Sequence, residues 1–256
     1  MTHTNKGKNF WEVNLGKERH INLVVVYNRI DCCQNRINGA IVWAGKHKCG
    51  TIHYRRNIKS YFINCNGVEA STVRVTLDKE YLSLAEVQVF GGAQTVSNLN
   101  LLSWRQKATQ SSTGWNGHAS RAVDGDPSGR YGHHSVTHTR YNKDNWWQVD
   151  LGATYPVYLV LIHNREEAPQ RINGAKVYLD NQLCGSISYI PYRRTYPINC
   201  DGKRGRKVKV VQDHDYLSLA EVMVFGIGYP FGGNGGIYAA NIGGKANSLK
   251  LSFEII

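Results

Sequence analysis

Tyr81-Leu-Ser-Leu-Ala-Glu-Val-Gln-Val-Phe-Gly91 recurs almost unchanged as Tyr216-Leu-Ser-Leu-Ala-Glu-Val-Met-Val-Phe-Gly226, at an offset of 135 residues. The similarity extends outward from this stretch at offsets of 135 or 136: Arg36-Ile-Asn-Gly-Ala40 recurs at 171–175, and Trp11-Glu-Val-Asn-Leu-Gly16 resembles Trp147-Gln-Val-Asp-Leu-Gly152. Repeats of about 20–50 residues build solenoids, whereas a repeat of this length is a whole domain. The sequence therefore predicts a tandem duplication.

Short runs rich in Val, Ile, Leu and aromatic residues indicate β-structure. They lie at Leu23–Tyr27, Ala40–Trp43, Val73–Leu77 and Leu84–Phe90, and again at Pro156–His163, Ala175–Leu179, Lys207–Val211 and Leu219–Phe225. Apolar and polar residues alternate in Val73–Leu77, as a strand with one buried face requires. Turn-forming residues separate the runs and no helical period is sustained, so we expect an all-β fold of two jelly-roll sandwiches. We expect Trp11, Trp146 and Trp147 in the cores.

The repeat also predicts the domain boundaries: residues 1–91 a shortened domain, 92–97 a linker, 98–226 a complete domain and 227–256 a Gly-rich tail. The first repeat, as it stands in this sequence, contains no counterpart of residues 98–136. The tail ends in Ser248–Ile256, whose alternating apolar positions predict a strand. One hypothesis is that this strand, from the same or a neighbouring chain, covers the gap by strand addition. The alternative is a flexible linker with a loose end.

The composition limits the partners and the compartment. The chain has 31 Lys and Arg against 19 Asp and Glu, a net charge of +12 that attracts polyanions. This charge is spread along the chain, which favours a generally basic surface over a nucleic-acid partner. No apolar run approaches the length of a membrane helix. Six cysteines, an even number, indicate an oxidising compartment. The polar start lacks a signal peptide, which indicates that a signal has been removed or that the start is incomplete.

The first candidate site combines His3 with Arg29, Asp31 and Arg36. Two guanidinium groups in a loop after a strand donate bidentate hydrogen bonds to vicinal hydroxyls, and an imidazole can donate or accept. Asp31 can orient a guanidinium by charge-assisted hydrogen bonds. A neutral sugar fits these donors. The alternative is a surface Arg–Asp ion pair with an incidental histidine.

The six cysteines allow fifteen pairings. Cys49 and Cys65 have the same separation as Cys184 and Cys200, and adjacent Cys32-Cys33 has no counterpart in the second repeat. The simplest set is 49–65, 184–200 and a vicinal 32–33 disulfide, whose flat sulfur face would pack against a sugar. Alternatively, Cys32 and Cys33 each pair elsewhere.

A second candidate site comprises Asp124, Asp126, Ser135 and Glu221. Two carboxylates in a turn, a hydroxyl and a distant glutamate provide the oxygens that Ca²⁺ prefers. The alternative is a pair of turn-forming aspartates with an unrelated glutamate.

The pattern of His, Arg-x-Asp and a second basic residue, together with Lys107–Ser111, Ala122–Gly125, Thr137–Thr139 and Arg171–Gly174, resembles the F-type lectins, the fucose-binding family of eel agglutinin. The resemblance covers roughly residues 1–91 and 98–226 and implies a discoidin-like jelly roll in each repeat. It implies sugar-binding residues in both repeats: His3, Arg29, Asp31, Cys32, Cys33 and Arg36 in the first, and His138, Arg165, Glu167 and Arg171 in the second. It also implies a structural Ca²⁺ in the second repeat, held by Asp124, Asp126, Ser135 and Glu221 with the carbonyls of Arg121 and Ala220. The second repeat lacks the sulfur pair, and Trp115, Tyr131 or His118 is expected to form another wall. Its loop is one residue shorter, which predicts a displacement of Arg171 by about 3.5 Å.

These observations predict a secreted, calcium-stabilised lectin without catalytic activity. It would recognise terminal L-fucose on glycans, in innate recognition or agglutination, and oligomerise through its tail. The alternative is a structural or adhesion unit of an extracellular coat or filament assembled through the C-terminal tail. An enzyme that uses His3 or His138 as a base is disfavoured because no nucleophile accompanies either residue.

Overall fold

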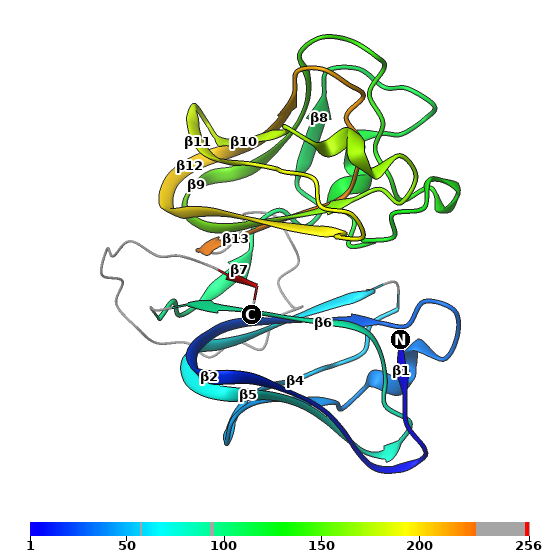
Figure 1. The fold of residues 1–256 in the computed structure, drawn as a ribbon, viewed down its shortest axis with the longest axis vertical. Coiled ribbons are helices and arrows are strands. Elements are labelled where there is room, and N and C mark those ends of the chain that lie inside the picture. Colours follow the sequence, from blue (N-terminus) through cyan, green and yellow to red (C-terminus); the bar gives the residue numbers. More distant parts are fainter. Residues whose placement is uncertain (57, 93–94, 229–253, 256) are drawn as a thin grey trace. The chain divides into compact units, whose positions relative to one another are not determined.

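The computed structural model describes residues 1–56, 58–92, 95–228 and 254–255 of the chain. The chain divides into two compact units (Figure 1). Unit 1 comprises Met1–Leu99 with the C-terminal residues, and unit 2 begins at Asn100. Each unit is built on one seven-stranded sheet.

Unit 1 contains, in chain order, β1 (Thr2–His3), β2 (Gly7–Asn28), the 3₁₀ turn η1 (Gln34–Ile37), β3 (Ile41–Ala44), β4 (His47–Thr51), β5 (Ser60–Glu80), β6 (Ser83–Gly92) and, at the C-terminus, β14 (Glu254–Ile255). Unit 2 contains β7 (Leu99–Leu101), β8 (Lys107–Gln110), η2 (Ala119–Val123), η3 (Tyr131–His133), β9 (Asn145–Asn164), η4 (Pro169–Ile172), β10 (Lys176–Leu179), β11 (Gln182–Ser186), β12 (Thr195–Gln212) and β13 (Leu219–Ile227).

The two sheets share one strand order. In unit 1 the order is β1-β6-β2-β5-β3-β4, with β14 also paired to β6. In unit 2 it is β11-β10-β12-β9-β13-β7, with β8 also paired to β9. The run β6-β2-β5-β3-β4 therefore corresponds to β13-β9-β12-β10-β11, as expected for two copies of one sequence pattern. The all-β prediction is confirmed.

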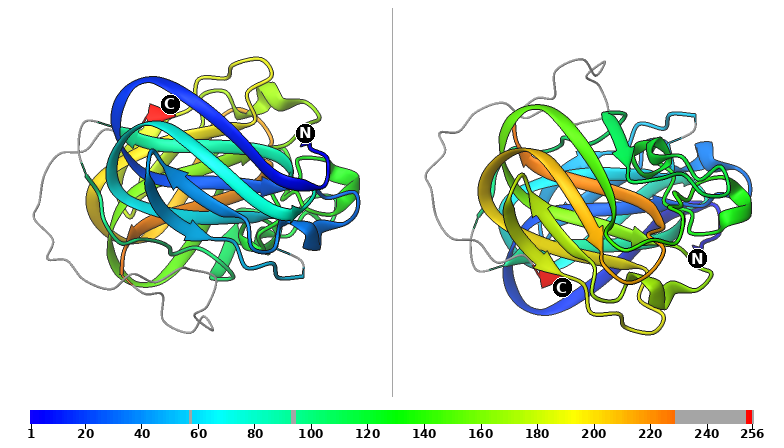
Figure 2. Two further views of the ribbon diagram at one scale, coloured as in Figure 1. Left: turned by 90° about the horizontal axis from the view of Figure 1, so that it is seen from below. Right: turned by 90° about the horizontal axis from the view of Figure 1, so that it is seen from above.

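The long central strands bend, and the bend produces two layers from one sheet (Figure 2). The first part of β9, Asn145–Asp150, pairs with the end of β12, whereas its second part pairs with the start of β12 and with β13. Gly152 lies between these parts with φ +85°, a conformation that side chains other than glycine rarely adopt. Gly16 has φ +80° at the same place in β2. Each end of the strand therefore serves a different layer of the sandwich.

The predicted strand runs all lie within β-structure, but their predicted lengths are wrong for four strands. The run Leu23–Tyr27 is the end of β2, which begins at Gly7. The missed part of β2 is largely exposed and polar, so no buried pattern marks it. Backbone pairing with β5 keeps it extended all the same.

The cores differ where the two repeats differ. In unit 2, Trp147, Val149 and Leu151 are fully buried. Their unit 1 counterparts, including Trp11 and Val13, are only partly buried. β8 pairs with β9 alongside Trp147, and no described strand of unit 1 corresponds to β8. The two repeats share the apolar residues of this strand, but only in unit 2 does a described strand, β8, lie alongside them.

The prediction that Trp146 belongs to the core is wrong. Neighbouring side chains of a strand point to opposite faces. Since Trp147 points inward, Trp146 points outward, where the ammonium of Lys209 lies 5.0 Å from its ring centroid. This cation–π contact covers the indole on the outer face of the sheet.

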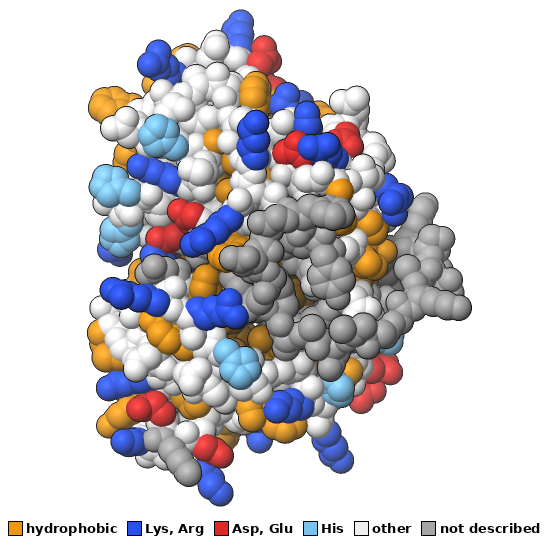
Figure 3. Space-filling view, turned by 180° about the vertical axis from the view of Figure 1, so that it is seen from behind, with side chains coloured by type: hydrophobic (Ala, Val, Ile, Leu, Met, Phe, Trp, Pro, Cys, Tyr) orange, Lys and Arg blue, Asp and Glu red, His pale blue; other side chains and the backbone are white. Residues whose placement is uncertain are grey.

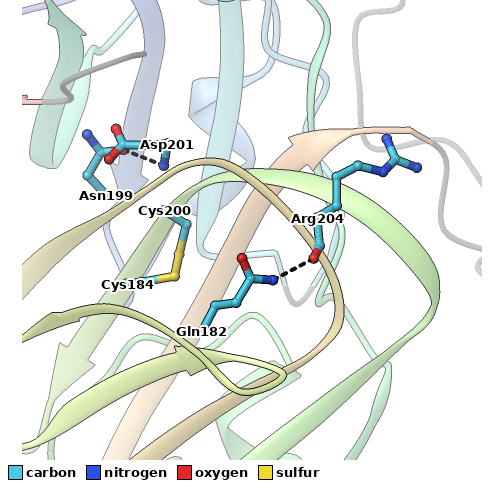
Figure 4. The surroundings of a disulfide bond; sticks show 6 residues. All are labelled: Gln182, Cys184, Asn199, Cys200, Asp201 and Arg204. Carbon is cyan, nitrogen blue, oxygen red and sulfur yellow. Dashed lines mark hydrogen bonds between the residues drawn. A yellow bond between two sulfur atoms is a disulfide. The ribbon is translucent and has the colours of Figure 1, made fainter. Parts of the chain in front are cut away.

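Two of the three predicted disulfides are present, Cys49–Cys65 and Cys184–Cys200. In unit 2 the bond joins β11 to the start of β12, although β10 separates these strands in the hydrogen-bonded order (Figure 4). A hydrogen bond from the Gln182 amide to the carbonyl of Arg204 lies beside it, at 3.0 Å. The disulfide therefore ties a hairpin to a strand of the other layer.

We expect the double variant Cys184→Ala/Cys200→Ala to lose about 3 kcal/mol of unfolding free energy, because each bridge closes a short loop in the unfolded chain. Equilibrium unfolding in urea measures this loss. Cys32→Ser/Cys33→Ser is the matched control, since these thiols are free, and we expect no change in midpoint from it. Equal midpoints for the two double variants would contradict the prediction.

On one face of the molecule, the described basic side chains do not gather into one patch. On the face shown in Figure 3, Lys and Arg lie scattered among Asp and Glu. Several are paired, for example Arg206 with Asp150 at 2.7 Å and Arg74 with Glu12 at 2.7 Å. Among the described residues, no helix is long and apolar enough to cross a membrane.

Candidate functional site

The loop after β9 carries the two arginines of unit 2, and a buried asparagine fixes its shape. Asn164, the last residue of β9, donates from its side-chain amide to the carbonyl of Pro169 at 2.8 Å. Its side-chain oxygen accepts the N–H of Arg165 at 2.9 Å. Pro169 then starts η4, which contains Arg171. One buried amide thus holds both ends of the short segment that separates the arginines.

His138, Arg165 and Arg171 converge on two tyrosine rings. The guanidinium carbon of Arg165 lies 5.5 Å from the centroid of Tyr131, and that of Arg171 lies 4.7 Å from the centroid of Tyr216. The ring of His138 meets both tyrosines edge-on, with centroids 5.7 Å and 5.2 Å away. Side chains from four separate segments therefore meet in one cluster.

The electrostatics of this cluster favour a neutral histidine between two cations. Burial lowers the pKa of His138 below its ordinary value, and the nearby guanidinium groups of Arg165 and Arg171 act in the same direction. Its Nδ1 lies 2.5 Å from the carbonyl of Thr139, so this nitrogen carries the proton and Nε2 is left as an acceptor. The cluster thus offers guanidinium donors beside one imidazole acceptor.

Burial also lowers the pKa of Arg165, and Glu167 opposes this shift. The Glu167 carboxylate lies 3.4 Å from a terminal nitrogen of Arg165 and accepts the backbone N–H of Tyr131 at 3.1 Å. The Arg165 Nε–H is buried and has no acceptor among the described residues. A desolvated cation held by one flanking carboxylate is typical of a binding site.

Of the three expected wall residues, Tyr131 lies in the cluster. Its hydroxyl donates to the backbone carbonyl of Trp115. The indole of Trp115 is 81% exposed, so it stands out from the loop. His118 lies before η2 and has no described side-chain contact with the cluster.

The unit 1 site has the same second arginine on the same kind of tyrosine. Arg36 lies 4.7 Å from the centroid of Tyr81, and His3 stacks on that ring at 5.3 Å. Arg29 is held by Asp31 through two hydrogen bonds of 2.8 and 2.7 Å. This pairing lowers the pKa of the Asp31 carboxyl and raises that of the Arg29 guanidinium. His3 is exposed, whereas His138 is buried.

The predicted vicinal disulfide is not formed. Cys32 and Cys33 are free thiols whose sulfur atoms lie 2.7 Å apart. Cys33 has φ +55° and immediately precedes η1, so the turn that positions Arg36 also fixes this cysteine. The hydrogen bond with Cys33 raises the pKa of the Cys32 thiol, with desolvation acting in the same direction. Both sulfur atoms nevertheless lie side by side in the loop that carries Arg29 and Arg36.

The shorter loop of unit 2 does not move Arg171 away from its tyrosine ring, so the expected displacement is wrong for this contact. Arg171 and Arg36 lie at the same 4.7 Å from Tyr216 and Tyr81. In each unit a residue of positive φ, Ala168 or Cys33, immediately precedes the 3₁₀ turn. The missing residue is therefore absorbed between Arg165 and this turn.

The structure adds a tyrosine and a serine to each site that the sequence analysis did not assign to it. Tyr81 and Tyr216 begin the repeated Tyr-Leu-Ser stretch, and its serines also contribute. Ser83 lies 2.6 Å from Nδ1 of His3, and Ser218 accepts from Arg165 at 3.4 Å. The repeat predicts the duplication and the strands, but we did not assign its tyrosine and serine to a site. The feature of the sequence that could have identified these residues is a tyrosine that stands just before each repeated apolar strand.

Glu221 of the second candidate site lies against the turn that carries Asp124 and Asp126. Glu221 is fully buried, and burial raises the pKa of its carboxyl well above the usual value, with Asp124 and Asp126 acting in the same direction. Its oxygens accept the N–H of Gly125 at 3.3 Å. In the described part of the chain no Lys or Arg forms an ion pair with Glu221. Its unit 1 counterpart, Glu86, is exposed.

The other members of this site are neighbours in the fold. Arg121 belongs to η2, which packs against β13, and Ala220 precedes Glu221 in β13. Ser135 is buried and donates to the carbonyl of Ser128 at 2.5 Å. Within the described ranges, no three His, Cys, Asp or Glu side chains are grouped closely enough to hold a metal by themselves. Ca²⁺ also uses hydroxyl and carbonyl oxygens, so the carboxylates would need Ser135 and the carbonyls of Arg121 and Ala220 to complete the set.

The fold and the cluster define a β-sandwich binding protein whose loops present guanidinium and imidazole groups at one end of the sheet. The family model for the NedA-like, galactose-binding domain matches residues 1–75 and 121–210. The chain is 35% identical over 134 residues to fucolectin-6 of Anguilla japonica, a match that covers 47% of this chain and 72% of that protein. It is 39% identical over 119 residues to fucolectin-4 of the same species, covering 42% and 66%. An F-lectin from striped bass (Morone saxatilis) serum shares 31% identity over 88% of this chain and 85% of that one, with a TM-score of 0.49. The chain belongs to the fucolectin family, within the NedA-like, galactose-binding domains.

Proposed function

We propose that the protein is a lectin that recognises terminal L-fucose on glycans, with the His138, Arg165 and Arg171 cluster of unit 2 as the principal site. The observation that carries this proposal is the convergence of two guanidinium groups and a neutral imidazole on Tyr131 and Tyr216. The relatives named fucolectins support fucose as the ligand. Catalysis forms no part of the proposal, because a binding site needs only fixed donors and acceptors.

The chemistry of the cluster matches a neutral sugar. A guanidinium donates two parallel hydrogen bonds to adjacent hydroxyl oxygens, and the bare Nε2 of His138 accepts a hydroxyl proton. Glu167 in unit 2 and Asp31 in unit 1 act on the arginines and not on the sugar, since each is hydrogen-bonded to the arginine two residues before it. In unit 1, Arg29, Arg36 and His3 form a second, more open site, with Cys32 and Cys33 in its loop.

Secretion and a calcium-stabilised loop complete the proposal. The two disulfides are typical of an oxidising compartment outside the cytosol. Calcium would be held by Asp124, Asp126, Ser135 and Glu221 with the carbonyls of Arg121 and Ala220, and would supply positive charge to the buried carboxylate. Two sites on one chain add avidity when they engage one glycan-bearing surface, as innate recognition or agglutination requires.

A second candidate function is favoured by one observation, the pairing of β14 with the edge of β6. A neighbouring chain's tail can make the same pairing, which would link chains into an extracellular coat or filament by strand addition.

A glycan array probed with and without calcium separates the two functions. We expect selective binding to terminal L-fucose, and weaker binding after chelation because the loop near Glu221 loses its cation. Binding to no glycan, or equal binding to fucosylated glycans and their defucosylated counterparts, would contradict the lectin and leave the structural function.

A further inference from the structure

β6 of unit 1 has one edge that faces away from β2. One edge of β6 pairs with β2 along Leu84–Gly92. At its other edge, β1 pairs only with Ser83 and Leu84. The continuation of that edge, at Phe90 and Gly91, is paired with Ile255 and Glu254 of β14. The C-terminal strand therefore covers an edge that the N-terminal strand does not reach (Figure 1).

In unit 2, β7 and the residues after it cover the equivalent edge of β13. The N–H of Leu102 donates to the carbonyl of Val224 at 2.7 Å. Ser103 continues the contact, since its hydroxyl donates to Val222 and accepts from the N–H of Val224. This contact places Leu102 beside Val224, the residue before Phe225. The edge strand of unit 2 thus comes from the start of its own repeat.

β14 covers the stretch of its edge that corresponds to the stretch covered in unit 2. Phe90, which pairs with Ile255, corresponds in the repeat to Phe225, the residue after the Val224 that Leu102 contacts. The sequences around these positions follow one pattern: Leu99-Asn-Leu-Leu102 at the start of repeat 2 and Phe253-Glu-Ile-Ile256 at the end of the chain. Both read apolar, polar, apolar, apolar.

We propose that the C-terminal strand is a donor strand for unit 1: it takes, on the same chain, the edge position on β6 that β7 takes on β13. The repeat supplies the acceptor edge, and the tail supplies a strand of matching pattern. Unpaired sheet edges bind other strands readily, so covering this edge also keeps unit 1 from pairing with a second molecule. This inference concerns the folding of unit 1 and is independent of the sugar site.

The tail is long enough for the pairing to be intramolecular. Residues 228–253 separate β13 from β14. A chain of that length can span up to roughly 90 Å. This length allows β14 to pair with β6 of the same chain, so an exchange of C-terminal strands between molecules is not required.

Hydrogen exchange of the full chain and of a chain ending at Asn247 tests the proposal. We expect amides of β6 around Val89–Gly91 to exchange about tenfold faster or more after truncation, because they lose their cover. The equivalent amides of β13 are the internal control and stay protected. Two point variants in the full chain distinguish loss of the strand pairing from general unfolding caused by truncation. Ile255→Asp should reproduce the faster exchange, and Glu254→Gln should not. A synthetic peptide of residues 248–256 should restore protection to the truncated chain, and a scrambled peptide should not.

Unchanged exchange of β6 after truncation would overturn the proposal. Protection that falls on dilution, with a mass above that of one chain by light scattering, would overturn its intramolecular form. Loss of protection in β13 as well as β6 would also count against it, because the tail would then stabilise the protein without serving as a strand of unit 1.

Discussion

The Arg165→Ala variant is expected to bind L-fucose about 10- to 100-fold more weakly than the parent, when both carry Arg29→Ala to silence the unit 1 site. A hydrogen bond from a charged donor contributes about 1.5–3 kcal/mol, which converts to that range of affinity. Arg165 is the less exposed arginine of the cluster, with 10% of its side chain exposed against 31% for Arg171, and hydrogen bonds of Glu167 and Asn164 hold its loop. Isothermal titration with a fucosylated oligosaccharide measures the change.

Two further variants make the result specific. Arg165→Lys keeps the charge but not the two-pronged donor, so we expect an intermediate loss. Arg206→Ala removes an exposed arginine of unit 2 that pairs with Asp150 on the sheet face, and should leave affinity unchanged. Undiminished binding by Arg165→Ala, with Arg206→Ala behaving alike, would refute the assignment of the site.

Removal of calcium is expected to lower the melting temperature of the parent by about 5–10 °C and to leave Glu221→Gln unaffected. A ligand present at 100 times its Kd stabilises the folded state by about 2.7 kcal/mol, which corresponds to such a shift for a unit of this size. Glutamine cannot supply the negative charge that a cation needs, so the variant should melt alike with calcium and with chelator. Differential scanning calorimetry measures all four conditions.

The pH dependence in chelator gives an independent readout. Burial raises the pKa of Glu221 in the folded state, so the folded protein holds this proton more tightly than the unfolded chain does. The resulting stability is complete below the unfolded pKa of about 4.5 and is lost as the pH rises through the folded value. In chelator the parent should therefore lose stability from about pH 4.5 upward, whereas Glu221→Gln should not. Glu86→Gln, at the exposed counterpart, should change neither curve. An identical melting temperature with calcium and chelator would contradict the cation site.

Pattern alone predicted the parts of the fold that depend on local sequence. The repeated Tyr-Leu-Ser-Leu-Ala-Glu-Val stretch predicted the duplication, and alternation predicted strands that β6 and β13 confirm. It missed the first half of β2, where exposed polar residues are kept extended by pairing with β5, which is distant in sequence. It also missed the first half of β9, although Trp147, Val149 and Leu151 alternate there on the buried face. It misplaced Trp146 because two adjacent tryptophans give no sign of which one faces inward.

The residues of the candidate site could likewise be predicted only in part. The arginines, the histidines and Asp31 could be chosen from residue chemistry and spacing, and the structure places His138, Arg165 and Arg171 in one cluster. Tyr216 and Ser218 could not be assigned from spacing, since they come from the far end of the repeat and reach the loop only through the antiparallel pairing of β13 with β9.

The sequence by itself determined the internal repeat of motifs, the β class, the cysteine pairs of equal separation and the types of side chain available for the candidate sugar site. These follow from periodicity and chemistry, which are local. The tertiary structure alone decided that Cys32 and Cys33 are free thiols, that Glu221 is buried where Glu86 is exposed, and that Arg171 keeps its tyrosine contact despite a shorter loop. Each of these depends on which distant strands and loops pack together, and identical repeat residues meet different neighbours in the two units.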